Sequence, residues 1–350
     1  MLFRSRDREL FRADVRAILE LSTGIQGFSS ELSDLADALL RIAFPRAIEL
    51  MAHNVPIGQN EGPGAFALFA LGKLGGRELG FASDLELLLV YDDQAADTNA
   101  VGTAGYFDLL VKSLRHLLSG HHQRSFELDF RLRPYGRSGP LATSLSAFRS
   151  YYSPTGPAWS YERQALVKLR AVTGDEELAS AVLLHRDHFV YGPEPFDFSQ
   201  SRQLRGRQIQ QLVRAGTINA KYSPGALVDI EYFVQALQIV HGASNNRLRT
   251  PSTVDALIAL NEAGLLSTPN TDSLRSAYVF FRTLIDALRI VHGQARDLTV
   301  PELSSREFAL LSRRLHFPHV DQLQATLKNQ LEFVRQIIKV PRPDFQPARD

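Results

Sequence analysis

The stretch 66–91, FALFALGKLGGRELGFASDLELLLVY, decides the fold that we expect for this chain. It starts within a run of small and apolar residues at 65–71, and this run ends in a glycine-rich turn at 72–76. An acid-x-acid sequence follows at 84–86, and a continuous apolar run occupies 87–90. A short apolar run between turn signals is typical of a strand that is buried on both faces. The stretch therefore predicts a strand, a glycine turn and a second strand that carries two carboxylates.

The acidic side chains of this region form a pattern of their own. Asp84 and Glu86 are two residues apart, so on a strand both point to one face, where they repel each other unless a cation or a shared proton is present. A third carboxylate, Asp129, lies in the strictly alternating segment 126–133 (FELDFRLR), which predicts a half-buried strand. Glu127 shares its polar face and is an alternative to it. Asp84, Glu86 and Asp129 are therefore candidate ligands for a divalent ion held against a phosphate.

A glycine turn, an acid-x-acid strand and a third acid on a later strand resemble the DNA polymerase β-like nucleotidyltransferases. The resemblance implies that the turn amides hold nucleotide phosphates and that the carboxylates hold two magnesium ions. The candidates for nucleotide contact are Gly72, Lys73, Gly75, Gly76, Ser83, Arg131 and Arg133. Lys73 could instead lie along solvent, and Ser83 could instead shape the start of the strand. The two arginines suit bidentate phosphate contacts, whereas pairing with the neighbouring acids is their alternative. For the glycines the alternative is a tight turn that needs positive φ.

Longer blocks of the chain resemble the bacterial glutamine synthetase adenylyltransferase family. These blocks are GKLGGREL at 72–79, DFRLRP at 129–134, WSYERQAL at 159–166 and DIEYFVQ at 229–235, and the resemblance covers nearly the whole chain. It implies an α+β fold, with a nucleotidyltransferase domain between N-terminal helices and a C-terminal helical bundle. It also implies transfer of AMP to or from a tyrosine of glutamine synthetase. The implied ion is Mg²⁺, with Mn²⁺ as an alternative, and the implied substrates are ATP or ADP and phosphate. A PII-type nitrogen-signalling protein is a further implied partner.

One residue departs from the family pattern. The family usually has aspartate where this chain has Glu86, and the longer side chain would shift a bound metal by about one methylene. Positioning errors of ~1 Å can lower a rate ~100-fold. A catalytically weak or inactive regulatory half, which binds nucleotide or a signalling protein, is therefore one alternative function. A nucleotidyltransferase that acts on a different acceptor is another.

The direction of the implied reaction is left open by the sequence. The family protein normally has two such halves in tandem, and this chain has room for one. Residues 137–140 and 247–267 resemble the half that removes AMP, whereas Ala158 and Trp159 resemble the half that adds it. On balance these resemblances favour the removal of AMP.

Composition limits the classes of protein to consider. With 350 residues, 44% of them apolar and 22% charged, the chain fits a soluble globular protein of about two domains. Its net charge of +1 gives no electrostatic case for a nucleic-acid partner. It has no cysteine, which excludes disulfides and thiol-ligated metals. The charged N-terminus does not resemble a signal peptide, and no apolar run approaches ~18 residues, so we expect a cytoplasmic protein without a membrane segment.

The expected organisation has four parts: an N-terminal helical extension at 1–60, a catalytic domain at 61–175, a helical bundle at 176–340 and a loose tail at 341–350. In the extension we expect two helices, the second capped by Ser30 and interrupted at Pro45, and then a linker at 54–64. Further helices are expected at 103–119, at 159–170 with Trp159 in the core, from 223–224 to 242, at 272–292 and at 320–339.

Overall fold

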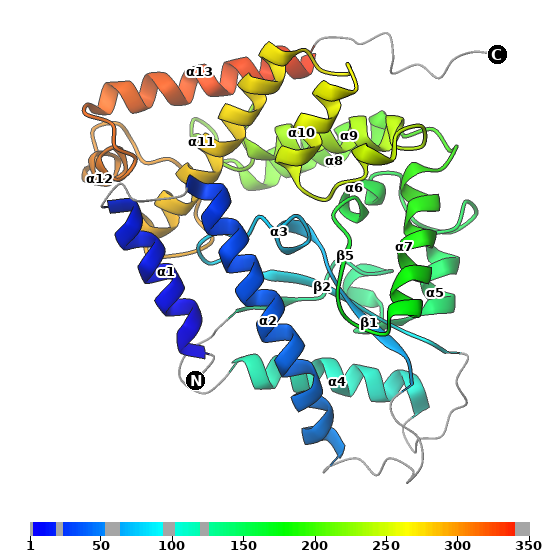
Figure 1. Cartoon of the computed structure of the whole chain (residues 1–350). Helices are drawn as coiled ribbons and strands as arrows, with labels where there is room; N and C mark the ends of the chain where they lie inside the picture. Colours follow the sequence, from blue (N-terminus) through cyan, green and yellow to red (C-terminus); the bar gives the residue numbers. More distant parts are fainter. Residues whose placement is uncertain (1–2, 19–23, 53–63, 94–101, 120–125, 340–350) are drawn as a thin grey trace, which may run out of the picture. The chain divides into compact units, whose positions relative to one another are not determined.

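The computed structural model describes residues 3–18, 24–52, 64–93, 102–119 and 126–339 (Figure 1). Residues 54–63 of the expected linker and the expected tail at 341–350 lie outside them. The chain divides into two compact units. The first unit comprises Met1–Arg16, Gly27–Leu79 and Ser83–Gly192, and the second comprises Ala17–Gln26, Gly80–Ala82 and Pro193–Asp350.

The first unit contains a mixed β-sheet. Within the described residues it has five strands: β1 (Phe66–Ala70), β2 (Leu85–Tyr91), β3 (Leu128–Asp129), β4 (Ala142–Ser144) and β5 (Arg170–Gly174). Their order is β3-β2-β1-β5, and β4 also pairs with β2. β1 pairs antiparallel with β2 and with β5, whereas β3 and β4 run parallel to β2. The predicted unit of strand, glycine turn and strand is thus confirmed, and it forms the centre of the sheet.

The alternating segment 126–133 does not form the long strand that its pattern predicts. Only Leu128 and Asp129 pair with β2, and the chain then leaves the sheet. Beyond this point the side chain of Arg133 turns back and donates hydrogen bonds to backbone carbonyls of its own loop, including that of Phe130. The predicted apolar face is nevertheless buried at Phe126, Leu128 and Phe130, because these side chains still reach the core.

Helices surround the sheet of the first unit. They are α1 (Phe3–Ile18), α2 (Gly24–Ala52), α3 (Gly72–Gly75), α4 (Gly102–Ser119), α5 (Leu145–Tyr151), α6 (Glu162–Leu166), α7 (Glu176–Tyr191) and the 3₁₀ turn η1 (Gly136–Ser138). Phe66 of β1 lies between Phe44 of α2 and Phe107 of α4, at ring-centroid distances of 5.1 and 5.9 Å. α7 packs against β1 and β5. The first unit therefore includes α2 and α7, which we expected in the flanking parts of the chain.

Two details of α2 differ from expectation. Ser30 lies inside the helix and does not cap it, because the helix already begins at Gly24. Pro45 does not interrupt the helix either. A proline inside a helix costs roughly 3 kcal/mol. The neighbouring Phe44 and Ala47 are fully buried, and we attribute the continuity of the helix to their packing.

The helix expected at 159–170 is wrong in extent. α6 ends at Leu166, and β5 begins at Arg170. The side chains of Lys168 and Arg170 explain the difference, because they bind Glu78 and Asp37 and so hold this segment beside β1. Trp159 is not a core residue, since 56% of its surface is exposed.

The second unit is helical, as expected. Its helices are α8 (Phe198–Leu212), α9 (Leu227–His241), α10 (Thr253–Glu262), α11 (Thr268–His292), α12 (Arg306–Arg314) and α13 (Val320–Lys339), with a 3₁₀ turn η2 (Asn246–Leu248). The predictions at 272–292 and 320–339 are confirmed, and α9 ends at Gly242 as predicted but begins later than expected. Apolar faces of α9 to α13 form one core. No helix in the described ranges is long and apolar enough to cross a membrane. The architecture confirms the predicted α+β class.

Candidate active site

The pairing of β2 with β3 brings two of the predicted acids together. Glu86 and Asp129 are register partners on these parallel strands, and Asp84 directly precedes β2. Side chains two residues apart on a strand share a face, so Asp84 belongs to the same face as Glu86. Asp84 is exposed, Glu86 is half-buried and Asp129 is 8% exposed. The three predicted carboxylates therefore lie at one edge of the sheet.

The guanidinium of Arg131 lies beside these carboxylates and binds Asp129. Arg131 donates from Nε to both carboxylate oxygens of Asp129, at 2.9 and 2.7 Å, and its backbone N–H donates to Oδ1 at 2.8 Å. Burial alone would raise the pKa of Asp129, but these hydrogen bonds outweigh it and hold the pKa below its usual value. The hydrogen bond with Asp129 raises the pKa of Arg131, and the charges of Asp129, Asp84 and Glu86 add to the effect. Arg131 thus supplies the positive charge that the acidic face requires.

The structure gives no ready-made metal cage. As the side chains stand, no three acidic or histidine residues in the described parts of the chain are arranged to hold a metal ion. The Asp129 carboxylate faces Arg131, and Glu86 reaches towards the glycine turn, where its Oε2 accepts a hydrogen bond from the backbone N–H of Lys73 at 3.3 Å. Metal binding by Asp84, Glu86 and Asp129 therefore stays a prediction.

Gly72 has a specific steric role in this arrangement. It has a positive φ of +50°, and a Cβ at this position would lie 1.3 Å from Oε2 of Glu86. The positive φ therefore favours glycine, and any larger residue would also displace the Glu86 carboxylate from its present position. The amides of Gly75 and Gly76 donate to the carbonyls of Leu71 and Gly72, at 2.8 and 3.1 Å, so they serve the turn itself. Gly75 and Gly76 therefore serve a turn, but neither has the positive φ that the tight-turn alternative required; of the three glycines only Gly72 has it.

Side chains distant in sequence hold the glycine turn in place. Arg170 donates to the carbonyls of Leu74 and Gly75, at 3.1 and 3.3 Å, and pairs with Asp37 of α2 at 2.8 Å. Lys168 pairs with Glu78 at 2.5 Å just beyond the turn. Asp37 could not be predicted as part of the site, because no local sequence pattern links a residue of α2 to a strand that follows much later.

Replacement of Gly75 tests this packing. A Cβ there would lie 1.9 Å from the backbone oxygen of Lys168, which cannot move aside as a side chain could. We expect Gly75→Ala to lower the free energy of unfolding by about 1–3 kcal/mol, the usual cost of overpacking. Thermal unfolding followed by circular dichroism measures the effect. The matched control is Gly206→Ala in α8, where nothing lies within 4 Å of an added Cβ and where alanine should hold or raise the melting temperature. Equal melting temperatures for the two variants would contradict the packing argument.

The remaining predicted nucleotide contacts fall into two groups. Lys73 and Ser83 flank the acidic edge: Lys73 Nζ is 3.8 Å from Glu78, and Ser83 is half-buried directly before Asp84. Arg133 lies elsewhere, because its guanidinium donates to the carbonyls of Gly139, at 2.9 Å, and Pro140, at 2.7 Å, besides that of Phe130. Arg133 is buried, and burial lowers its pKa. Its hydrogen bonds therefore close a loop, which differs from the phosphate contact that we expected.

Comparison with known protein families identifies the chain. Residues 2–184 match the family model described as glutamate-ammonia ligase adenylyltransferase. The chain belongs to this family. Within the adenylyltransferase match lie the whole glycine turn, Asp84, Glu86 and Asp129. Residues 199–340, which form most of the second unit, match a different model, described as GlnD PII-uridylyltransferase.

Individual relatives agree with this family. The chain is 33% identical over 300 residues to a bifunctional glutamine synthetase adenylyltransferase/adenylyl-removing enzyme of Cutibacterium acnes, covering 84% of the chain and 29% of that relative. It is 31% identical to the protein of the same name from Mycolicibacterium smegmatis, covering 90% and 30%, and 35% identical to that of Streptomyces coelicolor, covering 72% and 26%. The chain therefore spans less than a third of the length of these adenylyltransferases.

Proposed function

We propose that the first unit is a nucleotidyltransferase that adds AMP to a tyrosine of glutamine synthetase or removes it by phosphorolysis. The pairing of Glu86 with Asp129 across β2 and β3, with Asp84 on the same face, carries the proposal. Family membership supports the reaction class. The relatives are named for both activities, and this chain spans only part of each, so both directions remain within the proposal.

The carboxylate oxygens of the site are suitable ligands for a divalent metal ion. Carboxylate oxygens are the ligands that Mg²⁺ and Mn²⁺ prefer, and Asp84, Glu86 and Asp129 offer three such groups at one edge of the sheet. We propose Mg²⁺, with Mn²⁺ as an alternative ion. When bound, the ion would neutralise phosphate charge and stabilise the attacking and leaving oxygens. Arg131 must then release the carboxylate of Asp129, since both cannot occupy the same oxygens.

The chain's own residues carry the remaining steps of the proposal. Arg131, once released from Asp129, binds a phosphate of the nucleotide through its planar guanidinium, and Lys73, Gly72 and Ser83 contact the other phosphate oxygens. The Asp129 carboxylate orients the acceptor hydroxyl and takes its proton. Gly75, Gly76 and Arg133 act as scaffold, in keeping with their hydrogen bonds to neighbouring carbonyls and amides.

Both directions of the reaction balance with these groups. In the adding direction the tyrosine oxygen forms a bond to the α-phosphorus of ATP, the bond to pyrophosphate breaks, and the hydroxyl proton passes to Asp129. In the removing direction an oxygen of inorganic phosphate forms a bond to the phosphorus of the attached AMP. The bond between this phosphorus and the tyrosine oxygen breaks, the proton of the attacking phosphate passes through Asp129 to the tyrosine oxygen, and ADP is released.

A regulatory half is the second candidate, and one contact favours it. The Glu86 carboxylate is hydrogen-bonded to the Lys73 amide at 3.3 Å, within the turn that would hold phosphate. If this contact persists, the site binds nucleotide without efficient transfer. The match of residues 199–340 to the PII-uridylyltransferase model supports a PII-type protein as a partner in either case.

The intact mass of glutamine synthetase subunits tests the proposal. One sample contains unmodified subunits with ATP, the other adenylylated subunits with phosphate, and each is run with Mg²⁺, with Mn²⁺ and with a chelator. We expect a gain of AMP in the first sample or a loss of AMP in the second, in the presence of the ion only.

The other outcomes are equally specific. No change in either sample, with ATP still bound, would contradict transfer to this substrate and favour the regulatory half. Modification of another protein in place of glutamine synthetase would support a nucleotidyltransferase with a different acceptor. A change that persists in the chelator would contradict the role of the ion.

A further inference from the structure

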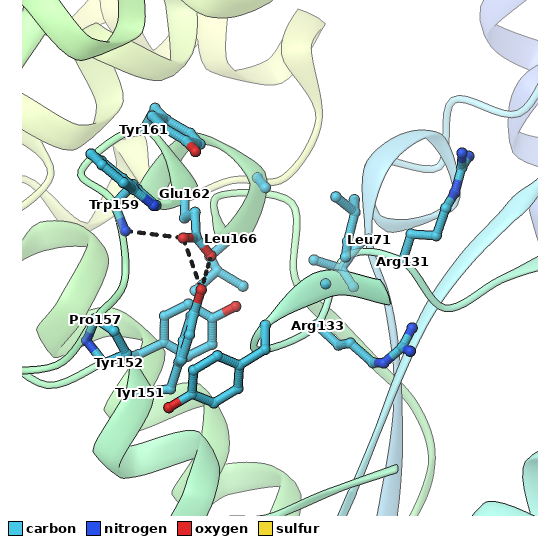
Figure 2. Close-up of a pocket in the computed structure, with 14 residues that line it drawn as sticks. Leu71, Arg131, Arg133, Tyr151, Tyr152, Pro157, Trp159, Tyr161, Glu162 and Leu166 are labelled. Carbon is cyan, nitrogen blue, oxygen red and sulfur yellow. Dashed lines mark hydrogen bonds between the residues drawn. The ribbon is translucent and has the colours of Figure 1, made fainter. Parts of the chain in front are cut away.

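Beside the candidate active site, the first unit contains a cavity of about 490 Å³ with aromatic walls (Figure 2). This volume is within the range of roughly 300–1,000 Å³ that is typical of small-molecule sites. Its lining includes Leu71, Arg131, Tyr135, Tyr151, Trp159 and Glu162. Each of these residues belongs to the first unit. Its aromatic residues, Tyr135, Tyr151 and Trp159, have no role in the proposed transfer of AMP.

Two large aromatic side chains at the cavity are left open to solvent. Trp159 is 56% exposed and Tyr135 is 59% exposed. The Trp159 ring lies nearly parallel to that of Tyr161, with 12° between their planes, and Tyr135 packs edge-on against Tyr151 at 4.8 Å. These neighbours fix the rings while leaving their surfaces accessible. Accessible, preordered aromatic faces around a hollow suit a planar ligand, because stacking needs little further ordering.

A fixed carboxyl group lies at the same side of the cavity. Oε1 of Glu162 accepts hydrogen bonds from the Trp159 backbone N–H at 3.0 Å and from the Tyr151 hydroxyl at 3.1 Å, as the dashed lines in Figure 2 show. A carboxylate offers about four acceptor positions, so Glu162 can accept a further donor from a ligand. Burial raises the pKa of Tyr151 to about 12, which keeps its hydroxyl protonated as a donor. The cavity therefore combines stacking surfaces with an oriented acceptor.

The opposite side of the cavity reaches the candidate catalytic residues. Leu71 lines the cavity and directly precedes Gly72 of the glycine turn, and Arg131, which also lines it, binds Asp129. A ligand that stacks near Trp159 would thus extend towards a cation and the acidic edge. A nucleotide fits this arrangement, because its planar base can stack near Trp159 while its phosphates extend towards Arg131.

We propose that this cavity is the base subsite of the nucleotide site, where an adenine ring stacks on Trp159 and Tyr135 and donates its exocyclic amino group to Glu162. The inference rests on the proposed nucleotidyl transfer and names the part of the site that selects the base. It assigns Trp159, Tyr135 and Glu162 as specificity residues, none of which was predicted from the sequence. A base with a carbonyl in place of the amino group loses the hydrogen bond to Glu162.

Fluorescence offers a direct measurement, because Trp159 is the only tryptophan in the chain. Its emission is recorded with selective excitation while adenosine, ATP or inorganic tripolyphosphate is added in the presence of Mg²⁺. We expect a saturable change with adenosine and with ATP but none with tripolyphosphate. A change with tripolyphosphate equal to that with ATP, or none with adenosine at millimolar concentration, would overturn the assignment.

Variants give the second measurement, by equilibrium dialysis with labelled ATP. Trp159→Leu and Tyr135→Ala should each weaken ATP binding about 10- to 100-fold, the contribution of one base stacked on an aromatic side chain. Tripolyphosphate affinity should not change. The matched control is Phe11→Leu, since Phe11 is an exposed aromatic of the same unit outside the cavity. The protein without substitutions should also bind ATP at least about 10-fold more tightly than ITP, which has a carbonyl in place of the amino group. An unpaired buried polar group weakens binding by about this factor.

These binding measurements separate this inference from the proposed function. ATP affinity that depends on Trp159, without any transfer of AMP, would support the subsite and contradict the transferase. Transfer of AMP with ATP affinity unchanged in Trp159→Leu and Tyr135→Ala would support the transferase and overturn the subsite. If no nucleotide binds, both are wrong.

Discussion

Asp84→Asn is expected to lower the rate of AMP transfer on the order of 1,000-fold without unfolding the protein. The substitution preserves the size of the side chain but removes one of three negative charges at the edge of the sheet. Loss of a metal-binding charge removes several kcal/mol of transition-state stabilisation, and each 1.36 kcal/mol corresponds to about tenfold in rate. Asp84 is exposed, and exposed substitutions usually change stability by no more than about 0.5 kcal/mol. The measurement is kcat/KM from the rate of mass change of glutamine synthetase, together with the melting temperature.

Glu127→Gln is the matched control for this experiment. Glu127 is exposed, lies beside β3 and was an alternative to Asp129 on sequence grounds. The register of β3 places Asp129, and not Glu127, opposite Glu86. We therefore expect Glu127→Gln to retain activity within about threefold, since a charge that only lies nearby is screened by solvent. Equal losses in both variants would indicate a general charge effect and contradict a specific role for Asp84.

The sheet around this site could be predicted because its signals are local. An apolar run, a glycine turn and an acid-x-acid pair lie within 66–91, and both strands formed as expected, β1 at Phe66–Ala70 and β2 at Leu85–Tyr91. The period of two along a strand also predicted that Asp84 and Glu86 share a face. The prediction that Asp129 joins them depended on a resemblance, since spacing alone did not distinguish it from Glu127.

The partners of the charged side chains could not be predicted in the same way. Alternation along 126–133 assigned Arg131 and Arg133 the same role, but Arg131 binds Asp129 whereas Arg133 closes a loop through backbone carbonyls. The difference arises because the chain leaves the sheet after Asp129. Similarly, the apolar character of 159–170 predicted one buried helix. It could not show that the helix ends at Leu166, or that distant acids bind Lys168 and Arg170, where β5 begins.

Lys168→Met is expected to give the largest loss of stability among single substitutions near the site. Nζ of Lys168 lies 2.5 Å from Oε2 of Glu78, and the two side chains are only 6% and 8% exposed. Removing one partner of a buried ion pair costs about 3–5 kcal/mol. Because Glu78 keeps its contact with Nζ of Lys73 at 3.8 Å, we expect a loss near the lower end of this range. For a unit of this size, such a loss corresponds to a fall in melting temperature on the order of 10 °C. Thermal unfolding followed by circular dichroism measures it.

A double variant and a surface control distinguish the ion pair from a general effect of losing a lysine. Lys168→Met combined with Glu78→Leu should recover most of the stability, because replacing both partners by apolar groups removes the buried Glu78 charge together with its main partner. Lys112→Met on α4 should change stability by no more than about 0.5 kcal/mol, since Lys112 is exposed. If Lys168→Met is no more destabilising than Lys112→Met, the pair does not hold the segment after the glycine turn. If the double variant is stable but transfers AMP slowly, Glu78 and Lys168 act on catalysis by positioning the turn that carries Gly72 and Lys73.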